Sequence, residues 1–387
     1  MYRQSDTLLL IVVSQFFCTS LWFSGNVIVI DIATANPDHF AAHFTSAVQF
    51  GFISGTLLFA LLAITDRYSP SKVFLVSAVL ASLCNLGLTL PTPNLQLLGF
   101  RFLTGFFLAG IYPVGMKIAS DYYKEGLGKS LGFLVGALVL GTALPHLLKA
   151  SLSSVPWQVI VVTTSGLAVL GGLIVFWRVP DGPFRKVGHH FSFSHVIQGY
   201  TSKALRSAAI GYFGHMWELY TFWAFVPFIL SEYSQITQQN VNVPGWSFVI
   251  IGIGAVACGA SGQLSSKYGE KRVATVALAI SCACCMLAPF VLKSPQLFIV
   301  LAFLLIWGVA VIADSPLFSA MVASEATAEW RGSALTIVTC IGFAITIVSL
   351  QIIRWIADWL PFPHYLIFLA IGPGWGLVSL LAGRNKK

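Results

Sequence analysis

Asp66-Arg67-Tyr68-Ser69-Pro70-Ser71-Lys72-Val73 and Ser266-Lys267-Tyr268-Gly269-Glu270-Lys271-Arg272-Val273 are two copies of one short basic turn, 200 residues apart. An apolar run precedes each copy and another follows it. Because a run of about 20 apolar residues spans the hydrocarbon core of a bilayer, each copy is predicted to be a tight hairpin between two membrane helices. An offset of about half the chain predicts a protein built from two repeats.

Composition supports a membrane protein over two soluble domains. The chain has 387 residues, of which 57% are hydrophobic and only 9% are charged. A soluble protein of this length needs far more charge to cover its surface. Since backbone polar groups in lipid must be satisfied within the protein, a bundle of membrane-spanning helices is expected. No cluster of basic and aromatic residues typical of a nucleic-acid groove is present, although the net charge is +8.

We predict an all-α membrane protein with twelve transmembrane helices in two parallel six-helix pseudo-repeats. The twelve spans lie near 7–33, 43–64, 73–90, 95–120, 129–149, 156–178, 205–231, 244–265, 272–291, 296–322, 333–357 and 362–383. Eighteen of the 22 Lys and Arg residues lie in or beside the even-numbered gaps and the two termini. Basic loops stay on the cytoplasmic side, so both termini and both basic turns are expected there.

The longest gap divides the chain into two halves. The expected domains are an N-terminal half at 1–179, a cytoplasmic linker with an interfacial helix at 180–203, and a C-terminal half at 204–387. The halves match beyond the basic turns, since Ala119-Ser120-Asp121 and Ala323-Ser324-Glu325 end spans four and ten, 204 residues apart. Two halves of the same orientation are parallel repeats about an axis along the membrane normal.

These motifs resemble those of the major facilitator superfamily of transporters. In that family a loop after the second helix carries Asp-Arg between two glycines and then basic residues; Asp66, Arg67 and Lys72 fit, whereas Leu62 and Ser69 replace the glycines. The second copy has Ser266 in place of the acid but retains the family's glycines and basic residues, at Gly262, Gly269, Lys271 and Arg272. The resemblance implies a gating role for both turns, including Lys267.

Span four adds a third motif, because Arg101-Phe-Leu-Thr-Gly105 resembles the family's buried Arg-x-x-x-Gly. The stretches 214–220 and 312–315 are similar to an uncharacterised bacterial branch, which implies a multi-pass protein of the bacterial cytoplasmic (inner) membrane. The family resemblance also implies a central cavity lined by spans one, four, seven and ten.

Four ionisable residues lie inside predicted spans: Arg101, His215, Glu218 and Asp314. Charge in the membrane is costly, so each is a candidate for substrate binding or proton coupling. Arg101 is either an anion site or a structural pin to a neighbouring span. His215 and Glu218 share one helical face, where proton exchange is expected. Asp314 precedes Ser315-Pro316, which is expected to break the helix beside a cavity, although an interhelical clamp remains an alternative.

Further cavity-lining candidates are polar or aromatic residues of the same spans, with lipid-facing or packing positions as the alternative: Trp22, Asn26, Tyr112, Trp217 and Tyr220. The seven cysteines lie within apolar spans without metal-ligand spacing, so we interpret them as small packing residues. No metal or cofactor is expected.

The sequence therefore predicts a secondary active transporter of a small organic solute, proton-coupled and working by rocking of the two halves. The alternative within transporters is a uniporter or organic-anion exchanger that uses Arg101 as a fixed counter-charge. No GxxxxGK[ST] motif supports nucleotide-driven pumping, and no nucleophile elbow supports an enzyme. A sensor without transport is a third class, which the buried charges disfavour. We expect a monomer whose partners are the solute, protons and the bilayer.

Overall fold

The structure is a computed structural model that describes residues 4–32, 37–123, 127–152, 154–185, 202–326 and 331–382. Within these ranges every regular element is a helix. Backbone contacts divide the chain into two compact units, Met1–Phe191 and Ser192–Lys387. Most of the predicted linker at 180–203, including its interfacial helix, lies outside the described residues.

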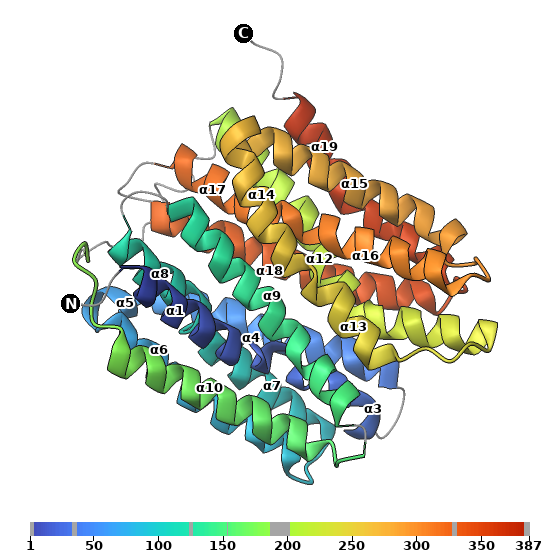
Figure 1. Ribbon diagram of the computed structural model, residues 1–387, viewed down its shortest axis with the longest axis horizontal. Coiled ribbons are helices and arrows are strands. Elements are labelled where there is room, and N and C mark those ends of the chain that lie inside the picture. Colours follow the sequence, from blue (N-terminus) through green and yellow to red (C-terminus); the bar gives the residue numbers. More distant parts are fainter. Residues whose placement is uncertain are drawn as a thin grey trace. The chain divides into compact units, whose positions relative to one another are not determined.

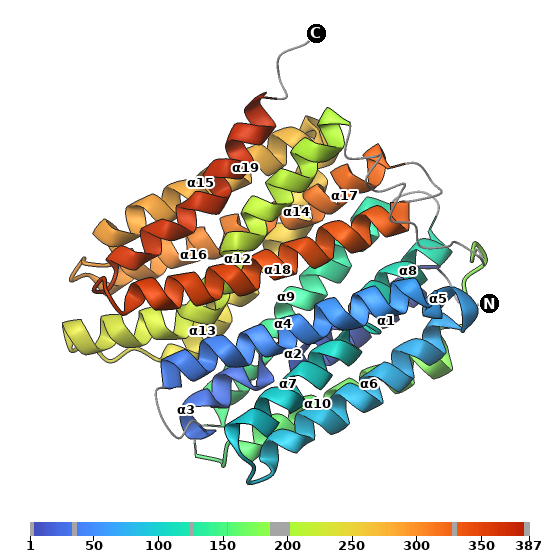
Figure 2. The same cartoon turned by 180° about the vertical axis from the view of Figure 1, so that it is seen from behind.

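The first unit contains long helices interrupted by short turns (Figure 1). Its elements are α1 (Gln4–Thr19), α2 (Leu21–Ser24), η1 (Asn26–Ile28), α3 (Val29–Ile32), α4 (Pro37–Leu61), α5 (Ile64–Arg67), α6 (Pro70–Leu86), η2 (Gly87–Thr89), α7 (Asn94–Leu108), α8 (Tyr112–Tyr122), α9 (Leu127–Ser151) and α10 (Gln158–Arg178). Helices α6 and α10 pack side by side, as do α4 and α7 (Figure 2).

The second unit has the same helical character. Its elements are α12 (Lys203–Thr237), α13 (Val243–Gly252), α14 (Gly254–Tyr268), α15 (Glu270–Val291), α16 (Leu297–Ala313), α17 (Ser315–Glu325), α18 (Arg331–Ala357), η3 (His364–Ala370) and α19 (Ile371–Ala382). Helix α12 packs against both α18 and α19, so it lies at the centre of this unit's packing.

Among the described residues, 11 helical stretches are long and apolar enough to cross a membrane. They coincide with eleven of the predicted spans within a few residues. The remaining prediction, 205–231, lies inside the 35-residue helix α12. Trp, Tyr, His and Glu side chains lower the mean hydropathy of α12. This helix is therefore less apolar than the eleven stretches and is not among them. The chain is an all-α multi-pass membrane protein.

Spans four and ten are broken at matching places. Helix α7 ends at Leu108 and α8 begins at Tyr112 with Pro113 in its first turn. Helix α16 ends at Ala313 and α17 begins at Ser315 with Pro316 in its first turn. Proline is tolerated in a first turn because its missing N–H has no partner there in any case. The break expected at Ser315-Pro316 is present, and the first unit has its counterpart.

Glycines let backbones meet in both units. A Cβ at Gly105 of α7 would lie 1.8 Å from the carbonyl oxygen of Val48 in α4. A Cβ at Gly214 of α12 would lie 2.3 Å from the carbonyl oxygen of Gly372 in α19. Such distances permit only glycine, and small residues allow membrane helices to approach this closely. The first contact holds α7, which carries Arg101 one turn before Gly105, close to α4 of span two.

Candidate functional site

Arg101 is completely buried and binds the broken segment of span one. Its Nη1 donates to the carbonyl oxygen of Leu21 at 3.0 Å and its Nη2 to that of Trp22 at 2.5 Å. Both acceptors belong to the single turn α2, between the end of α1 and η1. The guanidinium carbon also lies 5.3 Å from the centre of the Phe44 ring, a cation–π distance. Backbone dipoles and a ring face therefore stabilise this charge.

Within the described residues Arg101 forms no ion pair with a carboxylate. A Cβ at Gly25, just after α2, would lie 3.0 Å from the Arg101 side chain, so the chain passes close to the guanidinium. A carbonyl freed by a helix break costs free energy in lipid unless it finds a donor. Arg101 supplies two such donors, which is the geometry of the structural pin considered from the sequence.

His215 and Asp314 lie in contact between two helices, and they form an ion pair when the imidazole is protonated. The His215 Nδ1 lies 2.8 Å from Asp314 Oδ1, and both side chains are 1% exposed. His215 belongs to α12, whereas Asp314 occupies the break between α16 and α17. The rings of Tyr212 and Phe318 flank the imidazole, with centroids 6.0 and 6.1 Å away. The pair is therefore shielded from solvent, and its carboxylate belongs to the residue at the helix break.

Glu218 lies about one turn from His215 on α12 but has different partners. Its Oε1 accepts from Ser281 Oγ at 2.5 Å, Trp307 Nε1 at 2.5 Å and Cys285 Sγ at 3.2 Å. The donors come from α15 and α16. Its Oε2 has no hydrogen-bond partner in the described part of the chain. Neutral donors thus stabilise Glu218, although His215 lies on the same helical face.

Sequence reasoning missed these three donors. Cys285 belongs to the cluster that was interpreted as packing residues, and here its thiol also donates to a carboxylate. Trp307 stacks on Phe222 at 4.4 Å while its Nε1 reaches Glu218. A Trp, Ser or Cys in an apolar run can face lipid, pack against a neighbouring helix or donate a hydrogen bond. Which of these it does depends on the face that each helix turns toward Glu218, and the sequence does not give that face.

The first basic turn is tied down within its own unit. Asp66 Oδ1 lies 3.0 Å from Lys117 Nζ on α8. Arg185 donates to the carbonyl oxygens of Asp66 at 3.3 Å and Tyr68 at 2.8 Å, and it pairs with Asp181. These contacts join the end of α5 to α8 and to the segment after α10.

The second basic turn has a different backbone. Gly269 has φ = 86°, a conformation that favours glycine because it has no Cβ. Lys267 Nζ lies 5.2 Å from the centre of the Tyr268 ring. Lys271 and Arg272 stand in the first turn of α15. The second copy thus retains Gly269 because the backbone of this turn requires a positive φ.

A family model of the Major Facilitator Superfamily matches residues 8–350. The chain belongs to this superfamily. No curated protein sequence matches the chain significantly. The solved structures below share its fold.

Three similar structures are transporters by description. A bacterial homologue of the human lysosomal transporter Spinster, inward-facing and unoccupied, is 15% identical, with 98% of this chain and 94% of that chain covered and a TM-score of 0.64. A mutant of the nucleoside transporter NupG is 14% identical, with 98% of each chain covered and a TM-score of 0.71. The human organic anion transporter MFSD10 is 14% identical, with 98% and 99% covered and a TM-score of 0.76. These identities establish a common fold alone.

In this superfamily member the remaining candidates take varied positions. Asn26 Nδ2 donates to Thr45 Oγ1 at 2.6 Å, which joins spans one and two. The ring of Trp22 meets that of Phe52 edge-on at 5.0 Å. Both residues lie on or beside the turn that Arg101 holds. The structure therefore gathers Trp22, Asn26 and Arg101 around one break in span one.

The candidates of the second unit are less closely grouped. Trp217 Nε1 donates to the carbonyl oxygen of Phe368 at 3.1 Å, so this side chain faces η3. Tyr220 packs against Trp223 and Phe343, with ring centroids 5.3 and 5.1 Å apart. Tyr112, in the first unit, begins α8 after the break in span four. Their roles in binding stay predictions.

Proposed function

We propose that this superfamily member is a secondary active transporter of a small organic solute, coupled to protons and working by rocking of its two six-helix halves. The observation that carries the proposal is the buried His215–Asp314 pair, 2.8 Å apart at a helix break. The cytoplasmic placement of the basic turns and of both termini belongs to the same proposal, as do the bacterial inner membrane and the monomeric state.

The His215–Asp314 pair has the chemistry of a proton-exchange site. Histidine and a carboxylate can share one proton and together carry no net charge, whereas a second proton leaves an uncompensated charge. An uncompensated charge in the membrane interior is expensive, so proton exchange is favoured only while water reaches the pair. Alternating access supplies water from one side at a time. This is what coupling of transport to a proton gradient requires.

The helix break gives the pair a mechanical link. Asp314 stands between α16 and α17, where the helix is interrupted for one residue and Pro316 supplies no N–H. A change in the angle between these helices alters the distance from Asp314 Oδ1 to His215 Nδ1. Substrate contacts along spans seven and ten would thereby change proton affinity, and protonation would change the angle in return, as linkage demands.

Glu218 is the second candidate coupling residue. It lies near His215 on the same helix, but three donors converge on one of its oxygens. Hydrogen bonds to a carboxylate favour its charged form, while burial opposes that form. We assign the transported proton to the His215–Asp314 pair and keep Glu218 as a second candidate. Substitution of each carboxylate distinguishes the two candidates.

The alternative, a uniporter or organic-anion exchanger with Arg101 as counter-charge, receives less support. Two of the guanidinium nitrogens already donate to backbone carbonyls of α2. An anionic solute would have to compete with those carbonyls or bind elsewhere on the guanidinium. The fold shared with a described organic anion transporter does not favour that substrate class here, because the identity is only 14%.

The test begins with a thermal-shift screen of the purified protein against metabolite and drug libraries at two pH values. Each stabilising compound is then offered to proteoliposomes with and without an imposed pH gradient. Accumulation above equilibrium that requires the gradient supports the proposal. Uptake that stops at equilibrium, with or without the gradient, supports the uniporter instead, and binding without any uptake supports a sensor.

A further inference from the structure

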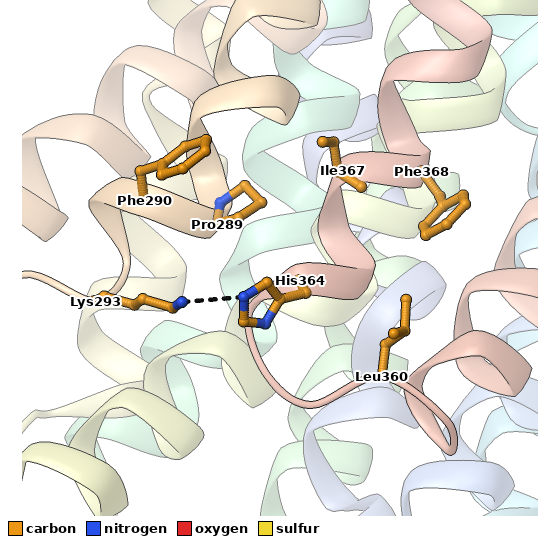
Figure 3. A pocket seen from close by; sticks show the side chains of 7 residues that line it. All are labelled: Pro289, Phe290, Lys293, Leu360, His364, Ile367 and Phe368. Atoms are coloured by element: carbon orange, nitrogen blue, oxygen red, sulfur yellow. Dashed lines mark hydrogen bonds between the residues drawn. The ribbon is translucent and has the colours of Figure 1, made fainter.

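A pocket of ≈ 350 Å³ lies in the second unit where α15 ends (Figure 3). Five of its lining residues are apolar: Pro289, Phe290, Leu360, Ile367 and Phe368. Lys293 and His364 complete the lining, and Figure 3 shows their side chains pointing toward one another. The proposed transport mechanism uses none of these residues.

The pocket lies at the depth where the spans leave the apolar core. The span of α15 ends at Val291, and the last span begins at His364. Trp355 and Trp359, beside the same loop, are 62% and 74% exposed. Exposed Trp side chains gather at the boundary between hydrocarbon and headgroups. The pocket therefore opens at headgroup level rather than in the middle of the bilayer.

Lys293 gives the pocket a positive charge. Its Nζ lies 3.0 Å from His364 Nε2, while His364 Nδ1 lies 3.2 Å from the carbonyl oxygen of Pro361. When Nδ1–H donates to that carbonyl, Nε2 can accept from the ammonium, so the charge stays on Lys293.

No carboxylate in the described ranges forms an ion pair with Lys293. Asp358, the acid of the adjoining loop, lies 2.6 Å from Arg354 instead. The ammonium thus keeps two N–H donors beyond the one that His364 accepts, and it stands beside an apolar wall. An anion with an apolar part suits this combination.

We propose that the pocket binds an anionic phospholipid, with the phosphate on Lys293 and the upper acyl chain along the apolar wall. Phe290 is 73% exposed and Ile367 39% exposed, so they continue the wall toward the lipid. A free phosphate ion would gain nothing from five apolar neighbours, since an anion loses hydration beside them. This site depends on the membrane position of the helices and not on the proposed transport function.

The experiment uses the full chain in detergent, and it follows thermal unfolding during titration with three probes: phosphatidylglycerol, phosphatidylcholine and glycerol 3-phosphate. In the wild type, phosphatidylglycerol should raise Tm at lower concentration than phosphatidylcholine, and glycerol 3-phosphate should have no effect. In Lys293→Gln the half-saturating concentration of phosphatidylglycerol should rise about fivefold, because one basic side chain near a lipid surface contributes about that factor. Lys293→Arg should retain most of the effect.

Lys267→Gln is the matched control, because Lys267 is also exposed but lies just before α15, whereas Lys293 follows the other end of that helix. It should titrate like the wild type. Equal effects of the two phospholipids, or an unchanged titration of Lys293→Gln, would overturn the proposal. An effect of glycerol 3-phosphate equal to that of phosphatidylglycerol would also overturn it, since the site would then recognise a soluble anion.

Discussion

At the scale of single residues, the buried charges of this transporter are stabilised in three different ways. Arg101 is satisfied by backbone carbonyls, His215 and Asp314 by each other, and Glu218 by neutral donors. The residue types and their membrane location were predictable from sequence, because charge inside apolar spans is rare. The partners were not, because they depend on which face each helix presents.

The carboxylates give the first prediction. In Glu218→Gln the amide oxygen can occupy the place of Oε1 and accept from Ser281 and Trp307, so folding and substrate binding should persist. Asp314→Asn removes the acid from the pair with His215 and should abolish accumulation driven by a pH gradient, while substrate exchange continues. Uptake into proteoliposomes with an imposed gradient measures both. Gradient-driven accumulation by both variants would exclude these residues as the coupling site, and loss in Glu218→Gln alone would move that site to Glu218.

Arg101 gives a second prediction, about stability. Arg101→Ala removes the guanidinium donors from two buried carbonyls of α2, at about 1–3 kcal/mol for a carbonyl left without a donor. The carbonyl of Leu21 still accepts from Ser24 Oγ at 3.2 Å, so the loss falls mainly on that of Trp22. Arg101→Ala should lower Tm markedly, whereas Arg101→Lys keeps a charge and N–H donors on a single nitrogen and should lower Tm less. Thermal unfolding in detergent measures the difference. A variant Arg101→Ala that unfolds like the wild type but loses substrate binding would instead support the anion-binding alternative.

At the scale of elements, the span boundaries follow from apolar length and were predictable to within a few residues. The break at Asp314 was predictable from Ser315-Pro316, whereas the subdivision of span one into α1, α2, η1 and α3 was not. No proline marks that subdivision. Thr19-Ser20 and Ser24-Gly25-Asn26 lie at its breaks, but a similar stretch, 163–166, lies inside the unbroken helix α10. The subdivision depends on Arg101, a residue far along the chain that satisfies the carbonyls of α2. Tertiary contacts decided what local sequence left open.

The contact between α4 and α7 gives a third prediction. In Gly105→Ala the new methyl would overlap the carbonyl oxygen of Val48, at 1.8 Å, and force the two backbones apart. Overpacking of this kind typically costs about 1–3 kcal/mol, so Tm should fall. Gly99→Ala on the same helix is the control, because a Cβ there meets nothing within 4 Å. It should leave Tm unchanged or raise it, and equal losses in both variants would refute a specific contact at Gly105.

At the scale of the whole molecule, repetition of the sequence predicted two equivalent halves, and the resemblance of the turns and of Arg101-x-x-x-Gly105 to family motifs implied the superfamily fold. The repeated turns diverge in what they do locally. The first forms a network with Lys117 and Arg185, while the second turns through Gly269. From residue identities alone, both turns were predicted to have the same gating role. Among the described residues, only the first turn has an ion pair with a carboxylate, which makes it the sharper test of gating.

Asp66 carries the last prediction. Its ion pair with Lys117 ties the end of span two to α8, the cytoplasmic half of span four in the proposed orientation. In a rocking transporter the cytoplasmic ends of the two halves close in the outward-open state. A tie that fixes the shape of the first half's cytoplasmic end should favour that closure, so losing the tie should favour the inward-open state. Asp66→Asn should therefore raise the labelling of cysteines placed along the cytoplasmic ends of these spans and slow transport, with the protein still folded. Lys117→Gln removes the same ion pair from its other end and should have the same effect. Labelling that stays at the wild-type level in both variants would show that this ion pair does not control gating, and an effect of Asp66→Asn alone would assign the role to Asp66 through another partner.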